Sequence, residues 1–193
     1  IIKSSLDEKP VIVVSAVKTI TNLLMNLAQK CAEGNYNSVL GQIKKIHMDI
    51  VDGLGLEKNI LDKDLASLAK TAEKIKSKGK YNEKMLDEIK SYGERMSSKI
   101  VAAELRKIGV DAEAFNAYDI GFITNKEFGN ADIIDESYSL IRKNIESIKS
   151  VPVITGYIGK TPTGKITTLS RGGSDYTASI IGAAINAEEI QIW

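Results

Sequence analysis

The sequence predicts an α/β protein in which a largely parallel sheet is sandwiched between helices. Two short apolar runs with many β-branched residues, 11–14 and 151–154, are typical of strands buried on both faces. Amphipathic segments with a helical period lie between and after these runs, and such alternation favours parallel pairing of the strands. A chain of 193 residues with 43% hydrophobic residues is long enough to bury a sizeable core.

The first half of the chain is expected to be one strand followed almost entirely by helices. The strand at 11–14 leads into a helix through residues 15–22. Apolar residues then repeat at helical spacing over a helical subregion at about 36–108. Glycines divide this subregion into separate helices. The last of these helices is predicted over 91–108. That start would place Glu94 in the first turn, where the helix dipole favours a carboxylate.

The second half of the chain is expected to consist of shorter elements. The pattern predicts, in order, a strand and loop at 115–124, an amphipathic helix at 136–149, a buried strand at 151–154, a turn at 161–165 with a return strand at 166–169, a helix at 174–186 and a final strand at 190–193. The pattern at the start of the chain, 1–6, is typical of the last turn of a helix, and the pattern at its end is typical of the first residues of a strand. We therefore expect the chain to be an excerpt of a longer protein.

Charge and hydropathy exclude two classes of partner. The 26 Lys and Arg residues nearly balance the 25 Asp and Glu residues, so the net charge is only +1. No global field would recruit a nucleic acid or a membrane surface, and we expect neither as a partner. No apolar run approaches the ~20 residues of a membrane span.

The scarcity of cysteine and histidine narrows the chemistry. Cys31 is the single cysteine, which rules out an internal disulfide and fits a reducing, cytoplasmic location. His47 is the single histidine and lies within a predicted helix, where a packing or boundary role is expected. A zinc site and a serine–histidine triad are therefore unsupported. Chemistry by positioning and electrostatics remains, with oxygen ligands and Mg²⁺, which is the profile of phosphoryl transfer.

The glycine loop before the last predicted helix is the strongest candidate for a binding site. Gly172 and Gly173 allow unusual dihedrals and the close approach of a ligand. The free N–H groups at the helix start form an anion site, to which Arg171 adds a planar fork for a carboxylate or phosphate. Ser174 or Asp175 is expected to cap the helix. The alternative is a glycine turn with a helix cap and a surface arginine.

Two other segments could contribute polar groups to the same site, because ligands of open α/β sheets bind beyond the carboxyl ends of the strands. Residues 15–22 follow a buried strand and offer several hydroxyls, among them those of Ser15 and Thr21. The alternative there is plain helix capping by Thr19 or Thr21. The second segment carries Glu94, and its alternative is a stabilising acid at a helix start.

These segments together resemble the aspartate kinases of the amino-acid kinase superfamily. Residues 167–178 resemble their Thr-Thr-Leu-Gly-Arg-Gly-Gly-Ser-Asp-Tyr-Thr-Ala signature. Further matches are the first substrate loop at 13–16 and 20–24, the buried-glutamate helix at 93–97, and the run before the nucleotide loop at 182–184 and 187–193. The resemblance implies that residues 1–193 are a partial catalytic domain of the amino-acid kinase (carbamate kinase-like) fold, with 36–90 its helical and least diagnostic part.

The resemblance also implies an activity and roles for single residues. The implied reaction transfers the γ-phosphate of ATP, with Mg²⁺, to the β-carboxylate of L-aspartate, as the first step of lysine, threonine and methionine biosynthesis. By that analogy Arg171 holds the α-carboxylate of aspartate and Glu94 holds its ammonium group. Thr21 lies near the reacting carboxylate, and Ser15 lies near the path of the phosphate.

The same analogy assigns the rest of the glycine loop. Asp175 is the implied catalytic organiser, while Ser174, Gly172 and Gly173 help to fix the substrate. The family's usual glycine is replaced by Ser170, which would be strained if that position needs a positive φ.

The chain lacks parts that the family has. Its Lys-Phe-Gly-Gly segment would precede Ile1, and its nucleotide loop and regulatory ACT domains would follow Trp193. We expect the 193 residues alone to be inactive or nearly so, and the full-length protein to be a homo-oligomer. Two alternatives stay open: a sibling kinase acting on glutamate, acetylglutamate, UMP or carbamate, and a non-catalytic binding or regulatory module with the same fold.

Overall fold

The computed structural model describes residues 6–193 and contains two small sheets and six α-helices within that range. In chain order the elements are β1 (Ile12–Val14), α1 (Ile20–Ala32), α2 (Asn37–Gly53), α3 (Asp62–Lys78), α4 (Glu83–Lys107), β2 (Ala112–Phe115), the 3₁₀-helix η2 (Ala117–Ile120), α5 (Glu136–Ser147), β3 (Val151–Thr155), β4 (Ile158–Lys160), β5 (Ile166–Thr168) and α6 (Gly173–Ile185). The predicted α/β class and the helical subregion at about 36–108 are confirmed.

The central sheet has three parallel strands in the order β1-β3-β2. Val14 pairs with Thr155 and Phe115 pairs with Ile154, so the three strands end at the same edge. Strand β4 pairs with β5 as an antiparallel hairpin, and this confirms the predicted turn and return strand. The carboxyl edge of the parallel sheet is the place where an open α/β sheet binds its ligands.

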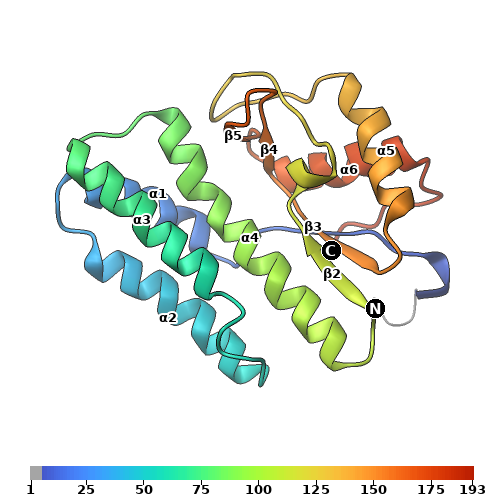
Figure 1. Cartoon of the computed structure of the whole chain (residues 1–193), viewed down its shortest axis with the longest axis horizontal. Helices are drawn as coiled ribbons and strands as arrows, with labels where there is room; N and C mark the ends of the chain where they lie inside the picture. Colours follow the sequence, from blue (N-terminus) through green and yellow to red (C-terminus); the bar gives the residue numbers. More distant parts are fainter. Residues whose placement is uncertain (1–5) are drawn as a thin grey trace.

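Helices cover both faces of the central sheet (Figure 1). Ile12, Val14 and Val153 belong to one hydrophobic cluster with the end of α4. Val13 and Ile154, which point to the opposite face, belong to a second cluster with α5 and α6. Helices α1, α2 and α3 lie on the far side of α4 from the sheet and form a third cluster with it. Helix α4 is therefore the wall between the helical lobe and the sheet.

Helix α4 begins earlier than the sequence predicted. Asn82 caps it by accepting a 3.0 Å hydrogen bond from Met85 N–H, and the helix then runs for 25 residues. The predicted start at Ser91 is wrong, because the residue that caps the helix is Asn82 and residues 83–91 already belong to it. Glu94 consequently lies in the middle of α4, and the explanation from a first-turn dipole does not apply to it.

Several other sequence predictions also need correction. The strand predicted at 115–124 is displaced to β2, and a 3₁₀-helix follows it. Residues 190–193 form no strand; Trp193 is 82% exposed, whereas Ile190 packs against Gly182. Strand β1 is half-buried rather than buried on both faces. The helix tail expected at the start of the chain falls mostly on residues 1–5, which lie outside the described residues.

None of the helices in residues 6–193 has both the length and the apolar character of a membrane span.

Candidate functional site

The three segments singled out in the sequence meet at the carboxyl edge of the central sheet. Ser15 follows the last residue of β1, and Gly156 follows the last residue of β3. The N–H of Gly156 donates a 2.8 Å hydrogen bond to the carbonyl of Val14, which holds the two strand ends together. A Cβ on Gly156 would lie 2.7 Å from Cβ of Ser174, so the start of α6 packs directly on this edge. The β1–α1 loop and the glycine loop are therefore neighbours.

Helix α4 reaches the same place through Gly93 and Glu94. A Cβ on Gly93 would lie 2.7 Å from Cβ of Ala16 and 3.4 Å from the Ile20 side chain. The missing side chain thus lets α4 approach the β1–α1 loop closely. Across this contact the N–H of Ala16 donates a 3.3 Å hydrogen bond to Oε1 of Glu94.

Glu94 is a buried carboxylate that is only half satisfied. The residue is 3% exposed, and its Oε2 has no hydrogen-bond partner among the described residues. Burial raises the pKa of Glu94 from 4.5 to about 7, against the opposing effects of backbone N–H groups, including that of Ala16, and of the charge of Lys90. A buried carboxyl with a free oxygen is suited to accept a hydrogen bond from a cationic or protonated group of a ligand.

The β1–α1 loop presents hydroxyl groups on a strained backbone. Thr19 occupies the N-cap of α1 at φ 74° and makes no side-chain cap hydrogen bond. The predicted alternative of capping by Thr19 is therefore not realised. A β-branched residue at positive φ is unusual, and such strain tends to occur at functional sites. Ser15 is exposed and Thr21 is half-buried, so both hydroxyls remain available to a ligand.

The glycine loop has a conformation that only part of the sequence argument foresaw. Gly172 is the N-cap of α6 at φ 81°, and the helix begins at Gly173. Ser174 and Asp175 consequently lie in the first turn, and the prediction that one of them caps the helix is wrong. Ser170 is not at positive φ, so replacing glycine there causes no strain of that kind.

Gly173 is required for packing under the loop. A Cβ at this position would lie 2.8 Å from Cδ2 of Tyr157 and 2.9 Å from Cβ of Leu169. Tyr157 itself has a positive φ of 64°. Its N–H donates a 3.0 Å hydrogen bond to Thr177 Oγ1, and this bond anchors the turn after β3 to α6. The turn that follows β3 thus packs against the glycine loop and holds it in place.

Arg171 and Asp175 are exposed, and within residues 6–193 neither side chain forms an ion pair. The structure therefore brings the predicted residues to one sheet edge, but it joins only some of them directly. Glu94 bonds the β1–α1 loop and Ser174 packs on Gly156, whereas no side-chain hydrogen bond within the described range links Thr21 to the other predicted residues.

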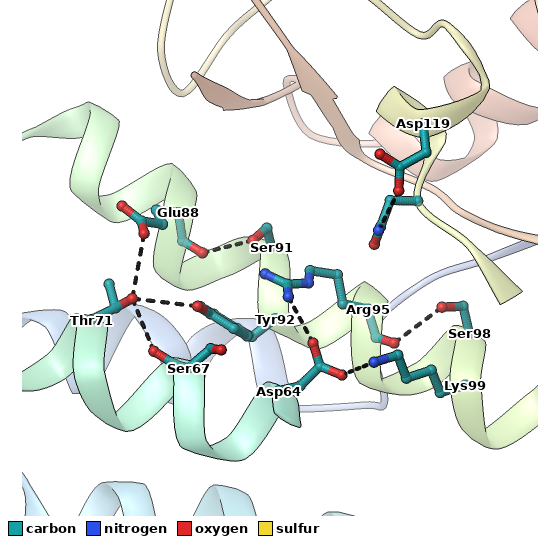
Figure 2. Close-up of polar contacts among 11 residues, drawn as sticks. Asp64, Ser67, Thr71, Glu88, Ser91, Tyr92, Arg95, Ser98, Lys99 and Asp119 are labelled. Atoms are coloured by element: carbon teal, nitrogen blue, oxygen red, sulfur yellow. Dashed lines mark hydrogen bonds and ion pairs between the residues drawn. The ribbon is translucent and has the colours of Figure 1, made fainter. Parts of the chain in front are cut away.

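The other flank of α4 is clamped to α3 (Figure 2). The buried Asp64 accepts a 2.8 Å hydrogen bond from Arg95 Nη2 and also forms an ion pair with Lys99. The Arg95 guanidinium lies 4.4 Å from the centroid of the Tyr92 ring. These contacts hold α4 against α3.

Sequence reasoning missed a buried ionic group near the site. Lys90 is 5% exposed and Asp87 is fully buried, and their side chains form an ion pair at 3.0 Å. Asp87 lies three residues before Lys90, and Glu94 lies four residues after it, so all three side chains share one stripe of α4. That spacing was visible in the sequence, but a lysine in a lysine-rich helical region is expected to be solvated. His47, by contrast, is buried as expected, with Nδ1 2.8 Å from the Ile43 carbonyl.

No group of three or more His, Cys, Asp or Glu side chains in residues 6–193 could hold a metal ion. In that range, the site offers a free buried carboxylate, an exposed guanidinium, hydroxyls and helix N–H groups. These are the groups that would bind a zwitterion or an anion.

Comparisons with known proteins show the family to which the chain belongs. The family model described as "Amino acid kinase family" matches residues 1–193. Aspartokinase 2, chloroplastic, of Arabidopsis thaliana is 39% identical over 97% of this chain and 36% of its own length. An aspartokinase of Thermus thermophilus is 40% identical over 56% of this chain and 26% of its own.

Solved structures show the same fold. E. coli aspartokinase III in complex with aspartate and ADP superimposes with a TM-score of 0.84 at 28% identity, over 99% of this chain and 44% of that one. The same enzyme in complex with lysine and aspartate gives 0.84 at 27% identity with the same coverage. The chain thus spans 35–36% of the length of the Arabidopsis aspartokinases 1 to 3.

Proposed function

The chain belongs to the amino acid kinase family, and we propose that the full-length protein is an aspartate kinase. It transfers the γ-phosphate of ATP to the β-carboxylate of L-aspartate and releases ADP and β-aspartyl phosphate. The observation that carries this proposal is the Oε2 of the buried Glu94, which has no hydrogen-bond partner within residues 6–193 and lies at the same sheet edge as the exposed Arg171. An amino acid offers one ammonium group and one α-carboxylate, and these two residues offer the complementary charges.

The residues of this chain act mainly by binding and orienting the acceptor. Glu94 accepts hydrogen bonds from the ammonium group, and Arg171 holds the α-carboxylate. The β-carboxylate then lies near the hydroxyl of Thr21, and the hydroxyl of Ser15 lies near the path of the phosphate. One of its oxygens attacks the γ-phosphorus as the bond to the ADP oxygen breaks. Both reactants are anions, so fixed donors that hold them in line supply much of the rate enhancement.

The start of α6 contributes in a second way. Gly172 and Gly173 leave the first N–H groups of the helix free of side-chain caps, and Ser174 adds a hydroxyl beside them. These groups help to fix the acceptor and its developing phosphate. Asp175, exposed in the first turn, is the group we assign to organising the phosphate-binding residues.

Use of ATP follows from membership of a kinase family, and E. coli aspartokinase III binds ADP. We propose Mg²⁺ as the accompanying ion. The residues of the range 6–193 do not form a metal site of their own. Mg²⁺ is commonly held by substrate phosphates, water and one or two carboxylates, so a dedicated protein cage is not required.

Three further assignments complete the proposal. The reaction is the first step toward lysine, threonine and methionine. The full-length protein is a homo-oligomer, located in the cytoplasm, with L-aspartate and ATP as its ligands. Analytical ultracentrifugation of the full-length protein tests the oligomeric state.

A coupled assay of ADP release by the full-length protein tests the reaction. Aspartate, glutamate, acetylglutamate, UMP and carbamate are offered in turn as acceptors at equal concentration. We expect turnover with aspartate alone. Turnover with glutamate but not aspartate would replace the proposal by a sibling kinase. Binding of aspartate without turnover of any acceptor would replace it by a non-catalytic module of the same fold.

A further inference from the structure

The strongest unexplained feature of the molecule is the buried ammonium group of Lys90. Its Nζ donates a 2.8 Å hydrogen bond to Oγ1 of Thr168 and lies 3.0 Å from Oδ1 of Asp87. It also lies 5.6 Å from the centroid of the Tyr157 ring. Burial by itself would lower the pKa of Lys90, but Tyr157 and Asp87 raise it above its ordinary value. The group is therefore a permanent buried positive charge.

Asp87 does not depend on Lys90 alone for its hydrogen bonds. Its carboxylate accepts the N–H of Gly129 at 2.8 Å, the N–H of Thr168 at 2.9 Å and the hydroxyl of Thr168 at 2.6 Å. Glu94 is different, because its second oxygen has no partner within residues 6–193. Glu94, which lies one helical turn further along α4, therefore depends more on the charge of Lys90 than Asp87 does.

The three ionisable groups form a row of alternating charge. Asp87, Lys90 and Glu94 lie on one stripe of α4, and all three are buried. With Glu94 ionised the row carries a net charge of −1. A ligand ammonium group at Glu94 would bring the row to neutrality, which favours a cation at that position over an empty site.

Lys90 is also connected to the loop that carries Arg171. Thr168, its hydrogen-bond partner, is the last residue of β5, and the next residue, Leu169, donates a 2.9 Å hydrogen bond to the carbonyl of Tyr157. The Tyr157 ring fills the space that a side chain at Gly173 would need. The ammonium group therefore lies beneath the glycine loop, and it belongs to a residue on the same stripe of α4 as Glu94.

Lys90 is the one buried cation that residues 6–193 place on the elements around Glu94. The neighbouring elements also carry Lys18 on the β1–α1 loop, and Arg171 and Asp175 at the start of α6, but these three are exposed. Water screens exposed charges strongly, whereas a buried charge acts through a medium of lower dielectric constant.

We propose that Lys90 is a positioning residue of the amino-acid subsite, which holds Glu94 ready to accept an ammonium group. This inference rests on the proposed function for its kinetic consequence. Its electrostatic part, the action of Lys90 on Glu94, holds whatever acceptor the enzyme uses.

The first experiment compares Lys90→Met with Lys99→Met in the full-length protein. Both substitutions remove a lysine from α4, but Lys99 pairs with Asp64 on the other flank of the helix. We measure kcat/KM for aspartate from pH 6 to 9. If removing Lys90 raises the pKa of Glu94 by about one further unit, kcat/KM for aspartate in Lys90→Met falls about eightfold at pH 6.5. At pH 8.5 it falls by less than about twofold.

The expected pattern has two controls. Lys99→Met keeps the wild-type pH profile, and Lys90→Arg, which retains the charge, recovers at least part of the loss at pH 6.5. KM for ATP changes little in all three variants. A loss that is equal at every pH would indicate a merely structural role for Lys90 and would overturn the proposal.

The second experiment does not depend on activity. Full-length protein labelled with ¹³C at Glu Cδ is titrated by NMR, and the Glu94 signal is assigned by its loss in Glu94→Gln. We expect the titration midpoint of Glu94 to rise in Lys90→Met. An unchanged midpoint refutes the action of Lys90 even if the wild-type protein is an active aspartate kinase. A raised midpoint in a protein that does not phosphorylate aspartate supports the action of Lys90 while refuting the proposed function.

Discussion

Replacing Glu94 with glutamine is expected to make the protein more stable above neutral pH and less able to bind aspartate. Glu94 is buried, and one of its oxygens lacks a partner in the described part of the chain. Ionising such a group in the folded state is costly, and a glutamine has nearly the same shape without the charge. The Ala16 N–H can still donate to the side-chain oxygen that remains.

The size of the effect follows from the pKa of Glu94. In the folded state it is raised by burial from 4.5 to about 7. Between these values the folded state binds more protons than the unfolded state, so the free energy of unfolding falls as pH rises through this window. A difference of about 2.5 units at about 1.4 kcal/mol each gives a loss on the order of 3 kcal/mol above pH 7. Glu94→Gln escapes this loss.

Urea unfolding at pH 5 and at pH 8 measures this difference. A longer protein with further domains does not unfold in a single two-state step. Hydrogen exchange of peptides that cover α4 therefore measures the stability of this domain separately. Glu94→Gln and wild type should differ little at pH 5 and diverge at pH 8. Glu83→Gln, at an exposed position in the first turn of the same helix, controls for the substitution itself.

Added aspartate tests the functional half of the prediction. A ligand that binds only the folded state stabilises it by mass action, so saturating aspartate should raise the urea midpoint of wild type. The same addition should have little effect on Glu94→Gln. The reasoning is refuted if Glu94→Gln is less stable than wild type at pH 8, or if aspartate stabilises both proteins equally.

The remaining predictions concern three other positions. Arg171→Ala in the full-length enzyme should raise KM for aspartate at least tenfold more than KM for ATP, since it removes a carboxylate fork; equal changes in steady-state assays would argue against that role. Gly93→Ala should lower both stability and aspartate binding, because the new Cβ would lie 2.7 Å from Cβ of Ala16, and wild-type thermal stability would show that α4 can move aside. Asp64→Ala should lower the free energy of unfolding in urea by about 1–3 kcal/mol, since two partly exposed cations lose their shared buried carboxylate.

The sequence allowed much of the fold to be predicted because its signals are local. Runs of β-branched residues marked β1 and β3, and helical periodicity marked the subregion 36–108. The prediction for α4 failed at its start because the cap at Asn82 was not recognised and the helix was begun at Ser91. Gly93 is tolerated inside the helix for a tertiary reason, the close approach of Ala16, and that reason cannot be read from neighbouring residues.

The candidate site could be predicted only through its motif. Physical reasoning made the loop around Arg171 an anion site, and the resemblance to a family made it an amino-acid site. The prediction of a cap at Ser174 or Asp175 failed because a glycine at positive φ took the N-cap instead. Lys90 was missed because burial of a lysine depends on partners that are distant in sequence; Thr168 lies 78 residues away.

The position of the site between hydrophobic clusters has a consequence for hydrogen exchange. Glu94 lies on α4 between buried residues of the helical lobe, whereas Arg171 follows Leu169, which belongs to the cluster around α5 and α6. Two clusters can open separately, so amides of either one can exchange while the other stays closed. An amino acid held by both residues would have to be released before either opening. Ligand binding would then slow exchange in both halves together, and residues far from the ligand, such as those of α3 and α5, would record its presence.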